Sequence, residues 1–201
     1  MKLLNIGCGD TRPGPPWINI DNWEGGGGCL NEPNFIFHDC RNPLPFEDNS
    51  FDGAFASHLF EHLDAQAAKK LMEEVNRILI PGGLLCVGVP NGSYHRKVWP
   101  EDTRDQSPRL FGEEIPPGDP VTNNLRRACF FHEHKQVFTE DSLWCHFVVS
   151  GFPSQHVKLF NPLEWQPDER RGNFATICNR IPFTLFMEGV KAMPGEDYKR
   201  P

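Results

Sequence analysis

The chain has 201 residues, of which 38% are hydrophobic and 23% are charged, and its formal net charge is −7. These values indicate one soluble globular domain over residues 1–201, and the acidic balance disfavours a broad nucleic-acid-binding surface. No apolar run approaches the roughly 18 residues that a membrane helix requires, and the first apolar stretch does not have the form of a signal peptide.

The seven cysteines are widely spaced, and no two of them form a C-x-x-C pair. An odd number with this spacing argues against a disulfide framework and against a zinc knuckle. We therefore expect a protein of the reducing cytoplasm.

The first third of the chain alternates short apolar stretches with turn residues. Residues 2–6 predict a first strand that breaks into a glycine loop. Residues 10–17 contain three prolines, which exclude a normal helix, so a second strand at 17–20 follows after a short, irregular connection. Third and fourth strands are predicted at 34–39 and 50–58.

A helix is predicted from Asp64, a favourable N-cap residue, to about residue 79, because apolar side chains recur at three- and four-residue steps. We expect Pro81, Gly82 and Gly83 to end it. Residues 84–89 are uniformly apolar, as in a buried central strand.

Residues 91–136 show little periodicity and are rich in proline, which is typical of a lid or substrate-binding loop. A second helix is predicted at 139–150, a strand at 155–160 and a last strand at 182–190, whereas 162–180 fit either a loop or a short helix. This alternation of strands and helices indicates an α/β fold with a doubly wound sheet.

The glycine loop contains Gly7 and Gly9, and the second strand ends in Asp21. Glycine lets a ligand approach the backbone closely, and a carboxylate in that place can accept hydrogen bonds from ribose hydroxyls. By themselves, these residues fit a simple tight turn equally well.

Five separated motifs together resemble the class I S-adenosylmethionine-dependent methyltransferases, in particular the small methyltransferase-11-like proteins. The motifs are Leu-Asn-Ile-Gly-Cys-Gly at 4–9, Asn-Ile-Asp at 19–21, Pro-Leu-Pro-Phe-Glu-Asp-Asn-Ser-Phe-Asp at 43–52, Phe-Glu-His-Leu at 60–63 and Arg-Ile-Leu-Ile-Pro-Gly-Gly-Leu-Leu at 77–85. The resemblance implies a Rossmann-like sheet of seven strands, mostly parallel with an antiparallel last strand. It also implies S-adenosylmethionine as the cofactor, with residues 91–136 as an insertion after strand five.

By this resemblance, Gly7 and Gly9 lie under the methionine and ribose part of the cofactor, and Asp21 binds the ribose hydroxyls. Asp39, with the backbone of Cys40, lies beside the adenine amino group. The full set of cofactor contacts that the resemblance implies is Asn5, Gly7, Cys8, Gly9, Asp21, Asn22, Asp39, Cys40, Arg41, Ser57 and His58.

Two features depart from the family pattern. The loop lacks the third glycine, and the proline segment replaces the helix that normally follows. Arg12 could hold the methionine carboxylate there, although a solvated loop arginine is the simpler interpretation.

Histidine suits a general base near neutral pH, and three histidines are catalytic candidates. His58, at the end of the fourth strand, is the first candidate, and its alternative role is to cap the turn after that strand. His132 and His134 are candidates for a substrate pocket. Their spacing also resembles that of metal ligands, but with only Cys129 or His95 as further ligands we predict no metal.

The leading hypothesis is an enzyme that methylates an oxygen or nitrogen of a small molecule, such as a sugar or a secondary metabolite. A non-catalytic S-adenosylmethionine-binding module that acts through a partner is the alternative. A nicotinamide-dependent oxidoreductase is disfavoured because Arg12 breaks the G-x-G-x-x-G spacing. We expect a small-molecule substrate, no membrane and no nucleic acid, and the oligomeric state stays open.

Overall fold

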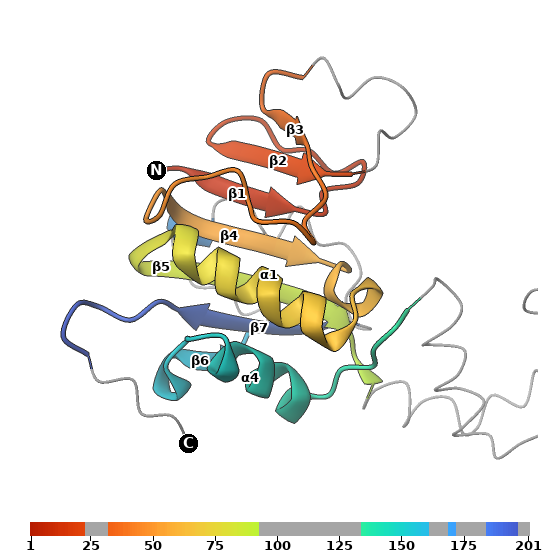
Figure 1. Cartoon of the computed structure of the whole chain (residues 1–201), viewed down its shortest axis with the longest axis vertical. Helices are drawn as coiled ribbons and strands as arrows, with labels where there is room; N and C mark the ends of the chain where they lie inside the picture. The colour runs from red at the N-terminus through yellow and green to blue at the C-terminus, as the bar shows by residue number, and fades with distance from the viewer. Residues whose placement is uncertain (23–31, 93–133, 161–168, 172–183, 197–201) are drawn as a thin grey trace, which may run out of the picture.

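Seven strands form one mixed sheet in the order β3-β2-β1-β4-β5-β7-β6 (Figure 1). The computed structural model describes residues 1–22, 32–92, 134–160, 169–171 and 184–196. The strands are β1 (Leu3–Ile6), β2 (Trp17–Asp21), β3 (Phe35–Phe37), β4 (Phe51–Ser57), β5 (Leu79–Pro90), β6 (Val157–Leu159) and β7 (Thr184–Val190). The first five pair in parallel and β7 runs antiparallel to both neighbours, which confirms the predicted α/β sheet.

Two α-helices, α1 (Ala65–Ile78) and α4 (Glu140–Val149), lie on the same face of the sheet (Figure 1). Both begin where capping residues predict. The Asp64 side chain accepts a hydrogen bond from the Ala67 backbone, and Thr139 forms a reciprocal capping box with Ser142. Three short 3-10 turns complete the described elements: η2 (Phe60–His62), η3 (Ser154–His156) and η5 (Glu169–Arg171).

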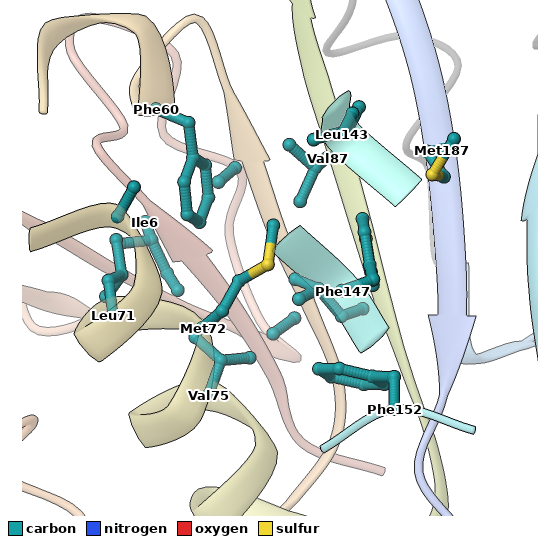
Figure 2. Packing of buried hydrophobic residues seen from close by; sticks show 14 of the residues in the cluster. Ile6, Phe60, Leu71, Met72, Val75, Val87, Leu143, Phe147, Phe152 and Met187 are labelled. Carbon is teal, nitrogen blue, oxygen red and sulfur yellow. The ribbon is translucent and has the colours of Figure 1, made fainter. Parts of the chain in front are cut away.

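The main core lies between these helices and the sheet. In Figure 2, Met72 and Val75 of α1 point toward Phe147 of α4, beside Val87 of β5, and all four side chains are buried. A smaller apolar cluster covers the opposite face of the sheet, where η5 approaches Gly53 so closely that an added Cβ would lie 2.2 Å from the Arg170 carbonyl oxygen. Among the described residues, both α-helices therefore cover one face of the sheet, and η5 packs on the other.

Several predicted boundaries were wrong by a few residues, and β5 differs most. It begins at Leu79, so Pro81, Gly82 and Gly83 lie inside the strand instead of ending the helix. The pairing with β4 shifts register between Phe51 and Gly53, which accommodates these residues as an irregularity. β6 is shorter than predicted, since Gln155 and His156 form part of η3, whereas the predicted last strand is described from Thr184 onward and its first two residues lie outside the described residues.

The proline segment between β1 and β2 contains no helix, as predicted, and buried amides hold it in place. The side chain of Asn5 donates to the Thr11 carbonyl (2.8 Å) and to the Asn19 side-chain oxygen (3.0 Å). Asn19 in turn donates to the Pro13 carbonyl at 3.0 Å, and Asn34 donates to the same carbonyl at 2.8 Å. This amide ladder takes the place of the hydrogen bonds that a helix would have made within itself.

Most of the predicted 91–136 insertion lies outside the described residues, as does most of 162–180, so the insertion and the single-domain assignment stay predictions. Chain segments 32–92 and 134–160 meet at an isolated parallel bridge between Asn91 and Phe138. In the described part of the chain, no helix is both long and apolar enough to cross a membrane.

An ion-pair cluster fixes the loop before β4 to the end of α1. The Arg77 guanidinium donates to Glu74, to Asp48 and to the carbonyls of Leu44 and Phe46. The Glu74 carboxylate also accepts from the Leu44 backbone at 2.8 Å. The hydrogen bond from Arg77 therefore lowers the pKa of Glu74 below its ordinary value of 4.5.

We expect Glu74→Gln to lower the free energy of unfolding by about 1–2 kcal/mol at pH 7. Because the folded pKa is depressed, this stabilisation is present above the unfolded pKa and is lost as the pH falls through the folded pKa. The difference between wild type and variant in urea denaturation should thus shrink below about pH 4. Glu73→Gln, which breaks an exposed pair with Lys69, is the control and should cost under about 0.5 kcal/mol.

Candidate functional site

The predicted cofactor residues gather where the parallel strands end. Gly7 follows β1, Asp21 closes β2, Asp39 follows β3 and Ser57 closes β4. Since these neighbouring strands run in parallel, their carboxyl ends form one edge of the sheet, which is where ligands bind in open α/β sheets. The predicted positions are thus brought to a common edge.

The two loop glycines both adopt positive φ, +67° at Gly7 and +50° at Gly9, but they face different surroundings. A Cβ on Gly7 would meet the Leu59 side chain at 3.0 Å, so this glycine allows protein to pack on the loop. A Cβ on Gly9 would have no heavy atom within 4 Å among the described residues. Among the described residues, the backbone at Gly9 is therefore open to close approach.

The Asp21 carboxylate is tied directly to that loop, because the Gly9 backbone N–H donates to its Oδ2 at 2.8 Å. Burial raises the pKa of the Cys8 thiol to about 11 and that of Cys40 to about 12, and the negative charge of Asp21 adds to both shifts. Both thiols therefore stay protonated and are poor nucleophiles near neutral pH. Asp21 lies close enough to both segments to connect the first loop with the one after β3.

Asp39 and Arg41 form a local pair in the turn after β3. The Arg41 guanidinium donates to both carboxylate oxygens of Asp39, and its backbone N–H donates to Oδ1 at 2.9 Å. These bonds lower the pKa of Asp39, so the group is ionised at neutral pH. The pair presents a fixed carboxylate at the edge predicted to hold the adenine.

His58 has a strained backbone and a fully engaged ring. It adopts φ +53°, uncommon for a residue other than glycine, directly after β4. Its Nδ1 lies 3.0 Å from Glu61 Oε1, and its Nε2 lies 2.9 Å from Thr184 Oγ1. With both ring nitrogens occupied, this geometry fits the alternative of a residue that caps the turn after β4 better than that of a free base.

His134 lies beside the turn that follows β4, although the two segments are far apart in sequence. The backbone N–H groups of Lys135 and Gln136 both donate to the Glu61 carbonyl, at 2.7 and 3.2 Å. The rings of His134 and His62 make an edge contact with centroids 4.8 Å apart. Sequence reasoning missed this grouping of Glu61, His62 and His134, because His134 lies more than seventy residues from the other two in the sequence.

Other predicted residues occupy varied positions. The Asn5 amide, predicted to contact the cofactor, donates to the Thr11 carbonyl and to Asn19 and thereby holds the proline segment. Asn22 is exposed after β2, and Ser57 is half-buried opposite Gly88 of β5. The Arg12 guanidinium lies over the Phe35 ring and 3.7 Å from Glu32. His132, Cys129 and His95 lie outside the described residues.

Comparison with known proteins agrees with this geometry. Residues 26–87 match a family model described as a methyltransferase domain. Squalene methyltransferase 1 of Botryococcus braunii is 30% identical over 141 residues, which is 58% of this chain but 35% of the relative. The chain thus spans about a third of the length of that relative.

Two solved structures share the fold over nearly the whole chain. A SAM-dependent methyltransferase from Archaeoglobus fulgidus is 18% identical with a TM-score of 0.58, covering 94% of this chain and 86% of its own. An S-adenosylmethionine-dependent methyltransferase from Mesorhizobium loti is 17% identical with a TM-score of 0.54, covering 94% and 90%. The family match over residues 26–87 and the shared fold thus agree with the resemblance to the class I S-adenosylmethionine-dependent methyltransferases.

Proposed function

We propose that this chain is an enzyme that binds S-adenosylmethionine at the carboxyl edge of its sheet and transfers the methyl group to an oxygen or nitrogen of a small molecule. The observation that carries the proposal is the bond from the Gly9 N–H to Asp21. It joins an open glycine backbone to a carboxylate, and a nucleoside ligand needs both groups within one short span.

The residues present suit such a ligand. The space beside Gly9 admits close approach to the backbone, and the second oxygen of the Asp21 carboxylate can accept from a ribose hydroxyl. Asp39, ionised beside Arg41, offers acceptors to an exocyclic amine. Fixed groups on strand ends position a ligand more accurately than flexible loops do.

When bound, S-adenosylmethionine supplies an activated methyl group. The task left to the protein is to align the acceptor, which can supply most of the rate by proximity. In this proposal, His58 is fixed between Glu61 and Thr184 at the end of β4 and orients the acceptor side of the site. His134 lies half-buried next to Glu61, with its Nε2 4.0 Å from Oε1.

Ligand binding tests the cofactor assignment first. S-adenosylhomocysteine at about 100 times its dissociation constant should add about 2.7 kcal/mol of stability, which raises the melting temperature by about 5–10 °C. NAD should leave the melting temperature unchanged. Stabilisation by NAD alone would instead support the oxidoreductase alternative.

Asp21→Asn should weaken S-adenosylhomocysteine binding about tenfold in calorimetry, because one charge-assisted hydrogen bond is lost while the amide oxygen still accepts from Gly9. Asp52→Asn is the matched control. Asp52 also accepts a backbone N–H, from Lys2, but it lies at the start of β4 and away from the ligand edge. Equal affinities in the two variants would reject the ribose assignment of Asp21.

Catalysis and mere binding are separated by a transfer assay. Purified chain, S-adenosylmethionine and a panel of small alcohols, sugars and amines should give a product one methyl group heavier in mass spectrometry. A chain that binds S-adenosylhomocysteine but methylates no member of the panel, alone or with a cell extract, fits the non-catalytic module.

A further inference from the structure

Glu61 is a buried carboxylate whose hydrogen bonding is incomplete. It is 1% exposed and lies in η2, directly after β4. Its Oε1 is paired with His58, whereas its Oε2 is buried and has no hydrogen-bond partner within the described structure. Burying a charged oxygen without a partner is costly, so this atom requires an explanation.

Two histidines stand next to this carboxylate. His62 follows it in η2, and His134 comes from the segment that enters α4, with Nε2 4.0 Å from Glu61 Oε1. One ligand atom from each of the three residues can be chosen so that all lie within 4.8 Å of one another. Both histidines are half-buried, so the cluster lies at the boundary between core and solvent.

Hydrogen bonds to backbone carbonyls hold these two segments together without using the side chains of Glu61, His62 or His134. The Glu61 carbonyl accepts from the backbone of Lys135 and Gln136, and the Gln136 side chain donates to the Leu63 carbonyl at 2.8 Å. Three hydrogen bonds thus fix His134 opposite Glu61 and His62. The two segments that carry the three side chains are therefore held next to each other whether or not an ion is bound.

We propose that Glu61, His62 and His134 bind a divalent first-row transition-metal ion such as Zn²⁺. Two imidazoles and one carboxylate form a donor set that such ions favour, and three protein ligands leave one position open. Around zinc, neighbouring ligand atoms lie about 3.3 Å apart, so side-chain rotation must draw the three groups together by about 1–1.5 Å. The Glu61 carboxylate can supply a ligand oxygen, because Oε2 has no hydrogen-bond partner within the described structure and Oε1 lies 4.0 Å from His134 Nε2.

His58 holds the carboxylate of this site without being one of the three proposed ligands. Its Nδ1 pairs with Glu61 Oε1 while its Nε2 is held by Thr184 of β7. A ligand carboxylate fixed by a second residue is typical of protein metal sites, where such partners commonly contribute about 10- to 100-fold to affinity. The strained backbone of His58 then serves to hold the ligand in place.

Metal binding is tested directly on the full chain without any activity assay. The protein is stripped with a chelator and titrated with ZnCl₂ by calorimetry, and with CoCl₂ by visible absorption. A Cys145→Ser background is used, because Cys145 is an exposed thiol that could bind either ion. We expect one ion per chain, a Co²⁺ spectrum without the thiolate charge-transfer band, and a higher melting temperature with Zn²⁺.

His62→Gln and His134→Gln should each weaken binding about tenfold or more. His156→Gln is the matched control, since this half-buried histidine also lies near a carboxylate, Glu196, but outside the cluster. If a cluster variant does not fold, the stoichiometry and spectrum of the Cys145→Ser protein still decide the question. Absence of binding, a thiolate band, or equal affinity in the control and the cluster variants would overturn the proposal.

Discussion

Gly9→Ala should reduce the affinity for S-adenosylhomocysteine about 10- to 100-fold while the protein stays folded. Its Cβ would enter the open space beside the loop, where the ligand approaches the backbone, and overpacking of this size costs about 1–3 kcal/mol. The positive φ of +50° adds about 1–2 kcal/mol of strain to the folded state. Calorimetry measures the affinity, and urea denaturation measures the strain.

Gly195→Ala separates these two effects. Gly195 also has positive φ, +89°, and no heavy atom within 4 Å of an added Cβ among the described residues, but it lies in the turn after β7. This variant should lose a similar amount of stability and no affinity. If Gly9→Ala binds as tightly as Gly195→Ala, the ligand does not contact this loop.

Phe147→Ala should lower the free energy of unfolding by about 3–5 kcal/mol and the melting temperature by about 10 °C. The ring is fully buried between α4 and the sheet, and it contacts Phe152 edge to face at 5.3 Å (Figure 2). An added Cβ on Gly189 of β7 would lie 2.6 Å from this ring, so the helix packs directly on the strand backbone. Removal of the ring leaves a cavity that the rigid sheet cannot close.

The matched control is Val149→Ala in the same helix, because this side chain is 55% exposed. It should change stability by less than about 0.5 kcal/mol. A loss of stability in Phe147→Ala no larger than in Val149→Ala would mean that α4 does not pack on β7 as described.

Most of the sheet could be predicted from local pattern. Short apolar stretches gave β1 to β4 within a few residues, and Asp64 and Thr139 marked the starts of both helices through their capping chemistry. The start of β5 could not be found this way. Pro81, Gly82 and Gly83 have the chemistry of a turn, yet pairing with β4 and β7 draws the flanking residues into one long strand.

Part of the candidate site could also be predicted from the local pattern of strands. Gly9 and Asp21 follow adjacent strands, so their meeting could be expected from topology, although the hydrogen bond between them could not. Glu61 and His134 lie close together in the fold but more than seventy residues apart in the sequence. No local sequence pattern predicts such a contact. The amide ladder from Asn5 to the proline segment also exists only once β1 and β2 have paired.

The place of β7 between β5 and β6 sets the order in which this sheet can be completed during protein synthesis. β6 is synthesised before β7, the strand with which it pairs. The edge of the twelve-residue β5 that does not face β4 also pairs with β7. A nascent chain that ends before residue 184 leaves β5 without its β7 partner, and unpaired apolar strand edges promote aggregation. The sheet therefore cannot be completed until β7 has been synthesised.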